Sequence, residues 1–219
     1  MKTRRIVVFG AGGHAKVVLD VLERMGVYEI VGLLDDNAEL LGTVRGRYSV
    51  LGGREQFTAL QNKGVDAIII ALGDNYDRKV VYEEAKRMGL TLCSAVDPSA
   101  QIGGGVVVGP GCLLVAGTVV NVDAEIGDNV ILNTGATVDH DCRIGAHVHL
   151  SPGVHLAGRV RIGEATHIGI GAVVLPNVSV GKNCIVGAGA VVREDLPDGV
   201  VAVGNPARII RNNEVALGF

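Results

Sequence analysis

A six-residue hydrophobic repeat runs without interruption from Val96 to Val192 and constrains the fold more than any other feature of the sequence. A short fixed period marks a repeat architecture, and a hexapeptide period is typical of a parallel β-helix. We expect each hexad to form a short strand and a turn, with three hexads, about eighteen residues, closing one triangular coil. The repeated aliphatic positions are Val96, Ile102, Val108, Leu114, Val120, Ile126, Leu132, Val138, Ile144, Leu150, Leu156, Ile162, Ile168, Val174, Val180, Val186 and Val192.

A second and usually small residue follows each aliphatic residue by four positions, as the narrow interior of such a helix requires. Three of the four cysteines, Cys112, Cys142 and Cys184, occupy this position. No pair of cysteines has the spacing of a metal site. We therefore predict that these thiols are buried core residues, as free cysteine often is.

Strands alternate with helices before the repeat, which predicts a small parallel sheet with helical crossovers. The expected strands cover residues 5–9, 28–34, 65–72 and 91–96, and the expected helices reach to about Met25 and cover residues 54–62 and 76–88. The sequence thus predicts a Rossmann-like α/β domain over residues 1–94. An all-β parallel β-helix with a short C-terminal tail follows over residues 95–219, without a flexible linker.

A glycine-rich loop follows the first expected strand. The segment Gly10-x-Gly12-x-x-Ala15 matches a dinucleotide-binding fingerprint, and Asp35 lies twenty residues after Ala15. A tight strand-to-helix turn would have the same pattern, and the domain is short for a dinucleotide. We favour a nucleotide-diphosphate ligand, bound where three loops meet at the carboxyl edge of the sheet. Those loops contain Gly12, Gly13 and His14, then Asp35 and Asp36, and then Gly73.

His140 is the strongest candidate for chemistry within the repeat. It lies at a hexad corner between Asp139 and Asp141, and a carboxylate can orient an imidazole ring and raise its basicity. A general base for acyl transfer has these properties, although a histidine at a corner can also be an ordinary surface residue.

The remaining histidines of the repeat follow its geometry. His149 and His167 are eighteen residues apart and should stack, whereas His140 and His149 are half a coil apart and should lie on different faces. A site that uses both would therefore lie between two subunits. His155 and His167 can also be solvated surface residues or residues of an intersubunit contact. A zinc site formed by these histidines is the weaker alternative, because no carboxylate or thiolate completes it.

Composition excludes several classes of function. A net charge of −3 gives no general affinity for nucleic acid. The sequence has no signal-peptide pattern and no apolar run near the length that spans a bilayer. We expect a cytoplasmic protein.

Taken together, these motifs resemble the bacterial nucleotide-amino-sugar N-acetyltransferases of the hexapeptide family, including those that act on UDP-linked bacillosamine precursors and GDP-perosamine. The sialic acid O-acetyltransferases are similar relatives. The motifs that carry the resemblance are 9–14 (FGAGGH), 34–36 (LDD), 71–75 (ALGDN), 132–134 (LNT), 138–142 (VDHDC) and 203–208 (VGNPAR).

The resemblance implies a left-handed β-helix, a homotrimer with sites between subunits, and acetyl-CoA as co-substrate without a metal. It implies that His140 is the general base, that Asp141 raises its basicity, and that His149, Ile170 and Ala188 contact acetyl-CoA. Gly12, Gly13, His14, Asp35, Asp36 and Gly73 match the pocket for the nucleotide-linked amino sugar. The other functions to consider are a sugar O-acetyltransferase, a non-catalytic nucleotide-sugar-binding protein and a zinc enzyme similar to a carbonic anhydrase.

Overall fold

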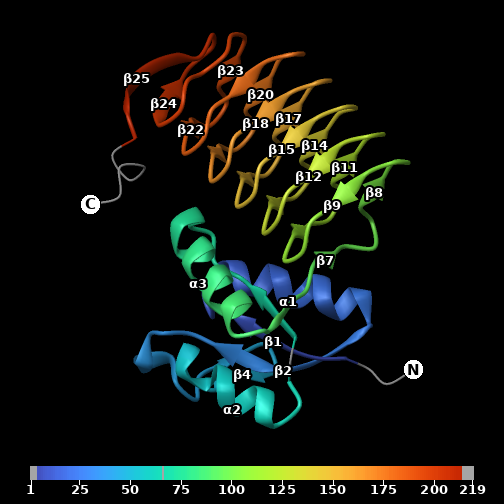
Figure 1. Ribbon diagram of the computed structural model, residues 1–219, viewed down its shortest axis with the longest axis vertical. Helices are drawn as coiled ribbons and strands as arrows, with labels where there is room; N and C mark the ends of the chain where they lie inside the picture. The colour runs from blue at the N-terminus through green and yellow to red at the C-terminus, as the bar shows by residue number, and fades with distance from the viewer. Residues whose placement is uncertain (1–3, 66, 214–219) are drawn as a thin grey trace. The chain divides into compact units, whose positions relative to one another are not determined.

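The computed structural model describes residues 4–65 and 67–213. The chain divides into two compact units between Pro98 and Ser99, a few residues beyond the boundary that the sequence suggested. Figure 1 shows helices and a sheet in the first unit and stacked coils of very short strands in the second. Among the described residues, no helix combines the length and the apolar character that crossing a membrane requires.

The first unit contains a four-stranded parallel sheet in the order β2-β1-β5-β6, as the alternating pattern predicted. Its core includes Val7, Phe9, Leu34 and Phe57, and all four are almost completely buried. The elements are β1 (Arg4–Phe9), α1 (Gly13–Met25), β2 (Tyr28–Leu34), a 3₁₀ turn (Ala38–Leu40), β3 (Val44–Arg45), β4 (Tyr48–Ser49), a 3₁₀ turn (Arg54–Gln56), α2 (Phe57–Asn62), β5 (Ala67–Ile70), α3 (Asn75–Arg87), β6 (Thr91–Leu92) and β7 (Ala95–Val96).

Helix ends in this unit follow from local chemistry. Helix α1 ends at Gly26, whose left-handed backbone lets its N–H reach the Leu22 carbonyl. Helix α3 begins after Asp74, whose carboxylate accepts hydrogen bonds from the Tyr76 and Asp77 backbone. The sequence did not indicate the β3–β4 hairpin, and the expected strand over residues 91–96 is divided into β6 and β7.

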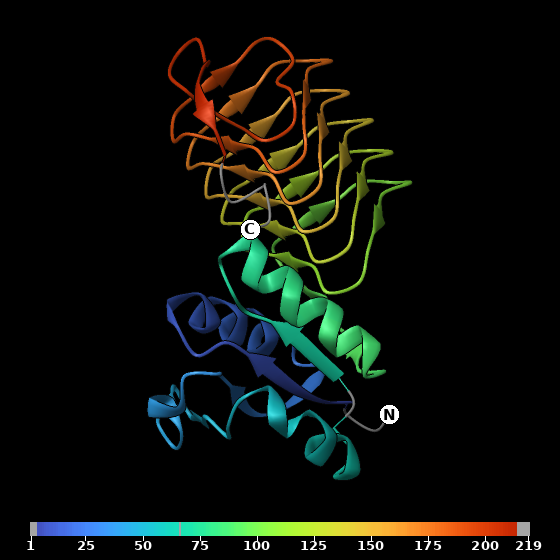
Figure 2. The ribbon, with the colours of Figure 1, turned by 60° about the vertical axis from the view of Figure 1, so that its left-hand side comes forward.

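The second unit is a parallel β-helix of two-residue strands, stacked coil over coil in Figure 2. Strands eighteen residues apart pair in register, for example Val138 with Leu156 and Ile144 with Ile162. The strands are β8 (Gln101–Ile102), β9 (Val107–Val108), β10 (Leu113–Leu114), β11 (Val119–Val120), β12 (Glu125–Ile126), β13 (Ile131–Leu132), β14 (Thr137–Val138), β15 (Arg143–Ile144), β16 (His149–Leu150), β17 (His155–Leu156), β18 (Arg161–Ile162), β19 (His167–Ile168), β20 (Val173–Val174), β21 (Ser179–Val180), β22 (Ile185–Val186), β23 (Val191–Val192), β24 (Val200–Val203) and β25 (Arg208–Asn212).

Three sheets form the faces of this helix. The β14 sheet has the order β8-β11-β14-β17-β20-β23, and the β15 sheet has the order β9-β12-β15-β18-β21. The β16 sheet contains β10-β13-β16-β19-β22 and continues into β24 and the antiparallel β25. From Val120 to Val192, the aliphatic residues of the hexads are buried inside the coils, which confirms the predicted phase.

The corners of the coils share one backbone conformation. Their third residue has a positive φ, and it is glycine at every β16-to-β14 corner from Gly117 to Gly189. At other corners the same position holds Asp123, Asn129, Asp141, His147, Arg159, Ala165, Asn177 and Asn183. Asparagine and aspartate tolerate this region because their short side chains bond locally, whereas other residues adopt it at a cost.

Candidate active site

His140 lies at the corner between β14 and β15, as the repeat predicted. Its ring Nδ1 is 2.8 Å from the Asp141 carboxylate, and 42% of its side chain is exposed. Asp141 has φ 59°, so the turn itself brings this carboxylate back toward the ring of the preceding residue. A neutral ring that donates its Nδ1 proton to Asp141 has a free lone pair on Nε2, and this is the arrangement of a general base.

The other flanking carboxylate, Asp139, holds the backbone of the turn. It accepts hydrogen bonds from the His140 N–H at 2.8 Å and from Asn121 at 3.0 Å, and these bonds keep the pKa of Asp139 below its usual value. The sequence suggested that both carboxylates could orient the ring. In the structure Asp141 contacts the ring, and Asp139 fixes the peptide that carries it.

The coil above completes this corner. The Arg159 N–H donates to the His140 carbonyl at 2.9 Å, and the Arg159 guanidinium lies 3.8 Å from the Asp141 carboxylate. Gly158, which precedes Arg159, is buried against the His140 ring. Neither residue was predicted to belong to the site, although the eighteen-residue period places both in the coil above His140.

Cys142 follows this turn and points inward, as predicted. It is completely buried, its thiol lies 3.1 Å from the Ala157 carbonyl, and burial raises its pKa. Cys112 and Cys184 are likewise buried. A buried thiol with a raised pKa is a poor nucleophile at neutral pH, so Cys142 is suited to packing.

His149 and His167 stack on the β16 sheet, with ring centroids 4.8 Å apart. Asn133 lies 3.3 Å from the His149 ring, and Ser151 lies 2.9 Å from the His167 ring. His149 is only 7% exposed. Because His140 lies between the other two sheets, a single β-helix presents His140 and His149 on different faces, as their half-coil spacing predicted.

Ile170 and Ala188 lie one above the other at the corner that follows the β16 sheet. Both are exposed, and Ile170 is 61% exposed although it is aliphatic.

His155 lies on the β14 sheet, where its ring is 2.9 Å from the Thr137 hydroxyl. Over residues 4–65 and 67–213, no three histidine, cysteine or carboxylate side chains are grouped so that they could hold a metal ion.

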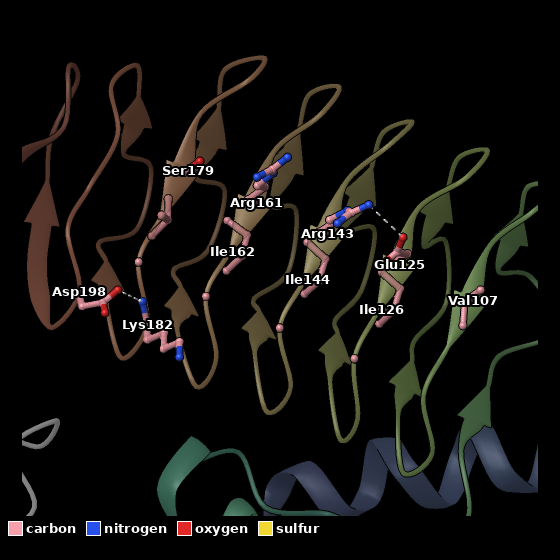
Figure 3. Close-up of a pocket in the computed structure, with 15 residues that line it drawn as sticks. Val107, Glu125, Ile126, Arg143, Ile144, Arg161, Ile162, Ser179, Lys182 and Asp198 are labelled. Atoms are coloured by element: carbon pink, nitrogen blue, oxygen red, sulfur yellow. Dashed lines mark hydrogen bonds and ion pairs between the residues drawn. The ribbon is translucent and has the colours of Figure 1, made fainter.

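A groove of about 720 Å³ runs along the β15 sheet (Figure 3). Arg143, Arg161 and Lys182 line it, and Arg143 pairs with Glu125 at 3.4 Å. Glycines at the first corner position line one side of the groove. These positions require glycine because a Cβ there would meet the backbone of the next coil, at a distance of 2.5 Å for Gly163. The hexad pattern does not reveal this groove.

A second cavity, of about 420 Å³, lies at the glycine-rich loop of the first unit. Gly12 and Gly13 line it at the N-terminus of α1, where backbone N–H groups attract anions. Lys16 and Arg45 add two positive charges, and Arg45 is held by a 2.8 Å hydrogen bond to the Ala11 carbonyl. Arg45 was not predicted to belong to this pocket, because the β3–β4 hairpin that carries it was not expected.

The remaining predicted pocket residues surround this loop without lining the cavity. Asp35 accepts hydrogen bonds from the Ala11 N–H at 2.8 Å and the Asn37 N–H at 3.0 Å, so it holds two loops in place. Asp36 pairs with Arg54, and Arg54 also reaches Glu84 at 2.8 Å. Partial burial raises the pKa of Asp36, but its hydrogen bonds with Arg54 outweigh this and hold the pKa below its usual value.

His14 and Gly73 lie beside a buried arginine. Arg78 is completely buried, and its guanidinium donates to the Gly73 carbonyl at 3.3 Å and to the Asn75 side chain at 2.8 Å. Burial, together with the positive charge of Arg78, lowers the pKa of His14 to about 4. His14 is therefore neutral at physiological pH.

Comparisons with known proteins agree with both units. Residues 5–85 match the PglD N-terminal domain family, and residues 123–158 and 159–194 match the bacterial transferase hexapeptide family. The fold and the repeat thus define a hexapeptide-repeat acyltransferase that carries an α/β domain.

Solved structures narrow this class. PerB from Caulobacter crescentus, in complex with CoA and GDP-perosamine, is 43% identical over 93% of this chain and 96% of that chain, with a TM-score of 0.88. The acetyltransferase domain of PglB from Neisseria gonorrhoeae is 41% identical over 94% of this chain and all of that chain, with a TM-score of 0.89. WeeI from Acinetobacter baumannii is 31% identical over 95% of this chain and all of that chain, with a TM-score of 0.85. The chain belongs to the family of nucleotide-amino-sugar N-acetyltransferases.

Proposed function

We propose that this protein transfers the acetyl group of acetyl-CoA to the 4-amino group of a UDP- or GDP-linked amino-deoxy sugar, with His140 as the general base. The observation that carries the proposal is the 2.8 Å contact between His140 Nδ1 and Asp141, which leaves the lone pair of Nε2 able to accept a proton. The likeness to PerB, solved with CoA and GDP-perosamine, supports the choice of substrates.

In this mechanism His140 removes a proton as the sugar amine attacks the thioester carbonyl. The new N–C bond forms, the C–S bond breaks, and the proton held on His140 passes to the departing CoA thiolate. Asp141 stabilises the imidazolium that exists between these steps. No acyl-enzyme forms, in agreement with the buried Cys142 thiol.

The α/β unit holds the nucleotide diphosphate in this proposal. Gly12 and Gly13 offer backbone N–H groups, and Lys16 and Arg45 offer positive charge around the same cavity. Asp35 and Asp36 position the adjoining loops, and the neutral His14 offers a hydrogen bond without a charge that would need a counterion. Gly73 adjoins His14 through Arg78 and permits a close approach of the sugar.

The active unit is a homotrimer in this proposal, because one chain presents His140 and His149 on different faces. Acetyl-CoA lies between neighbouring subunits, where His149, Ile170 and Ala188 contact it. Four buried cysteines that keep their thiols suit a reducing cytoplasm, where acetyl-CoA is available.

The test is acetyl transfer by the His140→Ala variant. Turnover, measured as release of the free CoA thiol across UDP- and GDP-linked 4-amino-6-deoxy sugars, should fall by about 10²–10⁴-fold, because a general base contributes that much. Acetyl-CoA binding by calorimetry should stay near wild type and serves as the control. Near-normal turnover by this variant would rule out His140 as the base, and release of thiol only with a sialic acid would establish O-acetylation instead.

A further inference from the structure

Gly158 and His140 occupy equivalent corner positions in successive coils, eighteen residues apart. A Cβ on Gly158 would lie 2.6 Å from His140 Nε2 and 2.7 Å from Cε1, closer than any real Cβ contact. The His140 ring therefore fills the space that the missing side chain leaves. The nearest three atoms to that space all belong to this ring.

The backbone at Gly158 does not require glycine. Its φ is not positive, unlike that of Gly153 or Gly171 at other corners. The same corner position holds Val122 in the coil below His140 and Pro176 in the coil above Gly158, so it accepts a side chain elsewhere in the helix. What distinguishes position 158 is the ring that packs against it.

The ring has little freedom to move away. Its Nδ1 edge is held by Asp141 at 2.8 Å, and Asp141 is fixed by the turn. The His140 peptide is held on both sides, because its N–H donates to Asp139 at 2.8 Å and its carbonyl accepts from Arg159 at 2.9 Å. A methyl group at position 158 must therefore rotate the ring, which breaks the Asp141 contact and turns Nε2 away from its present direction.

We propose that Gly158 is a positioning residue for acetyl transfer: the absence of its side chain leaves the space that the Nε2 edge of the His140 ring occupies while Nδ1 contacts Asp141. This inference rests on the proposed role of His140 as the general base. In addition, the coil above the base helps to determine the orientation of the His140 ring, which Asp141 alone does not fix.

The first experiment compares Gly158→Ala with Gly104→Ala. Gly104 occupies the same corner position in the first coil, and a Cβ there meets no atom within 4 Å. We expect Gly158→Ala to lower kcat by roughly 10–100-fold, because displacing a catalytic group by about 1 Å can cost up to about 100-fold in rate. The KM values for acetyl-CoA and for the sugar nucleotide should each change by less than about twofold. Gly104→Ala should keep wild-type kinetics. Wild-type kcat in Gly158→Ala overturns the inference, and so does a rise confined to KM, which would mean that the methyl group obstructs a substrate.

The second experiment places Gly158→Ala in the His140→Ala background. If glycine acts through the ring, the double variant should be no slower than His140→Ala alone, whereas independent effects would multiply. Where Gly158→Ala lowers Tm, the double variant should recover it, because the clashing ring is gone. A multiplied loss of rate, or a Tm that His140→Ala fails to restore, overturns the inference.

The two proposals fail separately. Activity retained in His140→Ala contradicts the proposed general base whatever Gly158→Ala does. Activity lost in His140→Ala but retained in Gly158→Ala leaves the base in place and removes only the positioning role.

Discussion

Two aspartates of one tripeptide act differently on the histidine between them. The Asp141 side chain faces the ring, whereas the Asp139 side chain faces the peptide N–H of the same residue. The difference arises from the backbone, because Asp141 is in the left-handed region and Asp139 is not. At the scale of the residue, conformation decides which of two identical side chains serves the chemistry.

His14 should make stability depend on pH between about 4 and 6.5. Its folded pKa is lowered to about 4 from 6.5, so in this window the unfolded chain binds a proton that the folded chain does not. Stability therefore falls as the pH falls below 6.5, by about 2 kcal/mol between pH 7 and pH 5 from this group. Urea unfolding at both pH values should show that the free energy of unfolding falls less from pH 7 to pH 5 in His14→Gln than in the wild type. Equal losses would contradict the lowered pKa of His14.

The coil corner is the element on which the second unit depends. Each corner passes through a residue with positive φ, and glycine, asparagine and aspartate take that position at most corners. Ala165 is an exception with φ 57°, and it has no polar side chain with which to bond locally. His147 and Arg159 are two further exceptions, so the repeat tolerates corners whose residues do not favour the conformation that the coil imposes.

Ala165→Gly should stabilise the β-helix. Relief of the left-handed strain is worth about 1–2 kcal/mol, and the added flexibility of glycine in the unfolded chain costs about 0.5–1 kcal/mol. A rise in Tm is expected by calorimetry. Ala146→Gly is the matched control, since Ala146 lies at the equivalent corner one coil below without a positive φ, and this variant should lower Tm. If Tm changed in the same direction in both variants, the positive φ of Ala165 would not be the cause of the change.

At the scale of the whole molecule, the chain joins two units with different structural periods. The α/β unit has a cavity at its glycine-rich loop, and the β-helix has columns of residues along its faces and corners. The proposed homotrimer follows from the second unit, because His140 and His149 belong to different columns of one chain.

Mixing two defective variants tests this arrangement. His140→Ala and His149→Ala chains, co-refolded in equal amounts, should recover activity if one site takes His140 from one subunit and His149 from its neighbour. About a quarter of the sites in randomly mixed rings would then have both histidines. Each variant refolded alone is the control. If the mixture shows only the average of the two, both histidines act within one chain or independently.

Much of this structure could be predicted from the sequence, and the reason is periodicity. Because Val138 and Leu156 must both point inward, the repeat also predicts that His140 lies at a corner, that His149 stacks on His167 and that Cys142 is buried. In the α/β unit, alternation predicted the parallel sheet, and the glycine pattern located the loop that borders a cavity.

Features that depend on contacts between distant segments were not predictable. Arg45 reaches the Ala11 carbonyl from a two-strand hairpin too short to leave a pattern. The hydrogen bonds that Asp35 accepts from the Ala11 and Asn37 N–H groups also depend on the folded loops, and its predicted contact with a ligand stays a prediction. Gly158 looks like any corner glycine in the sequence, and only the coordinates place the His140 ring over it.

The in-register stacking of strands eighteen residues apart also restricts how such a chain can change in length. An added hexad between His140 and Ile170 would turn every later coil by one face, so Ile170 and Ala188 would move to a different corner while their own hydrophobic pattern stayed intact. An added coil of eighteen residues would preserve the corner and only raise it by one strand spacing, about 4.8 Å. Insertions that keep every residue well packed can therefore still separate the proposed base from the proposed acetyl-CoA contacts, and relatives should differ in length by whole coils or at single corners.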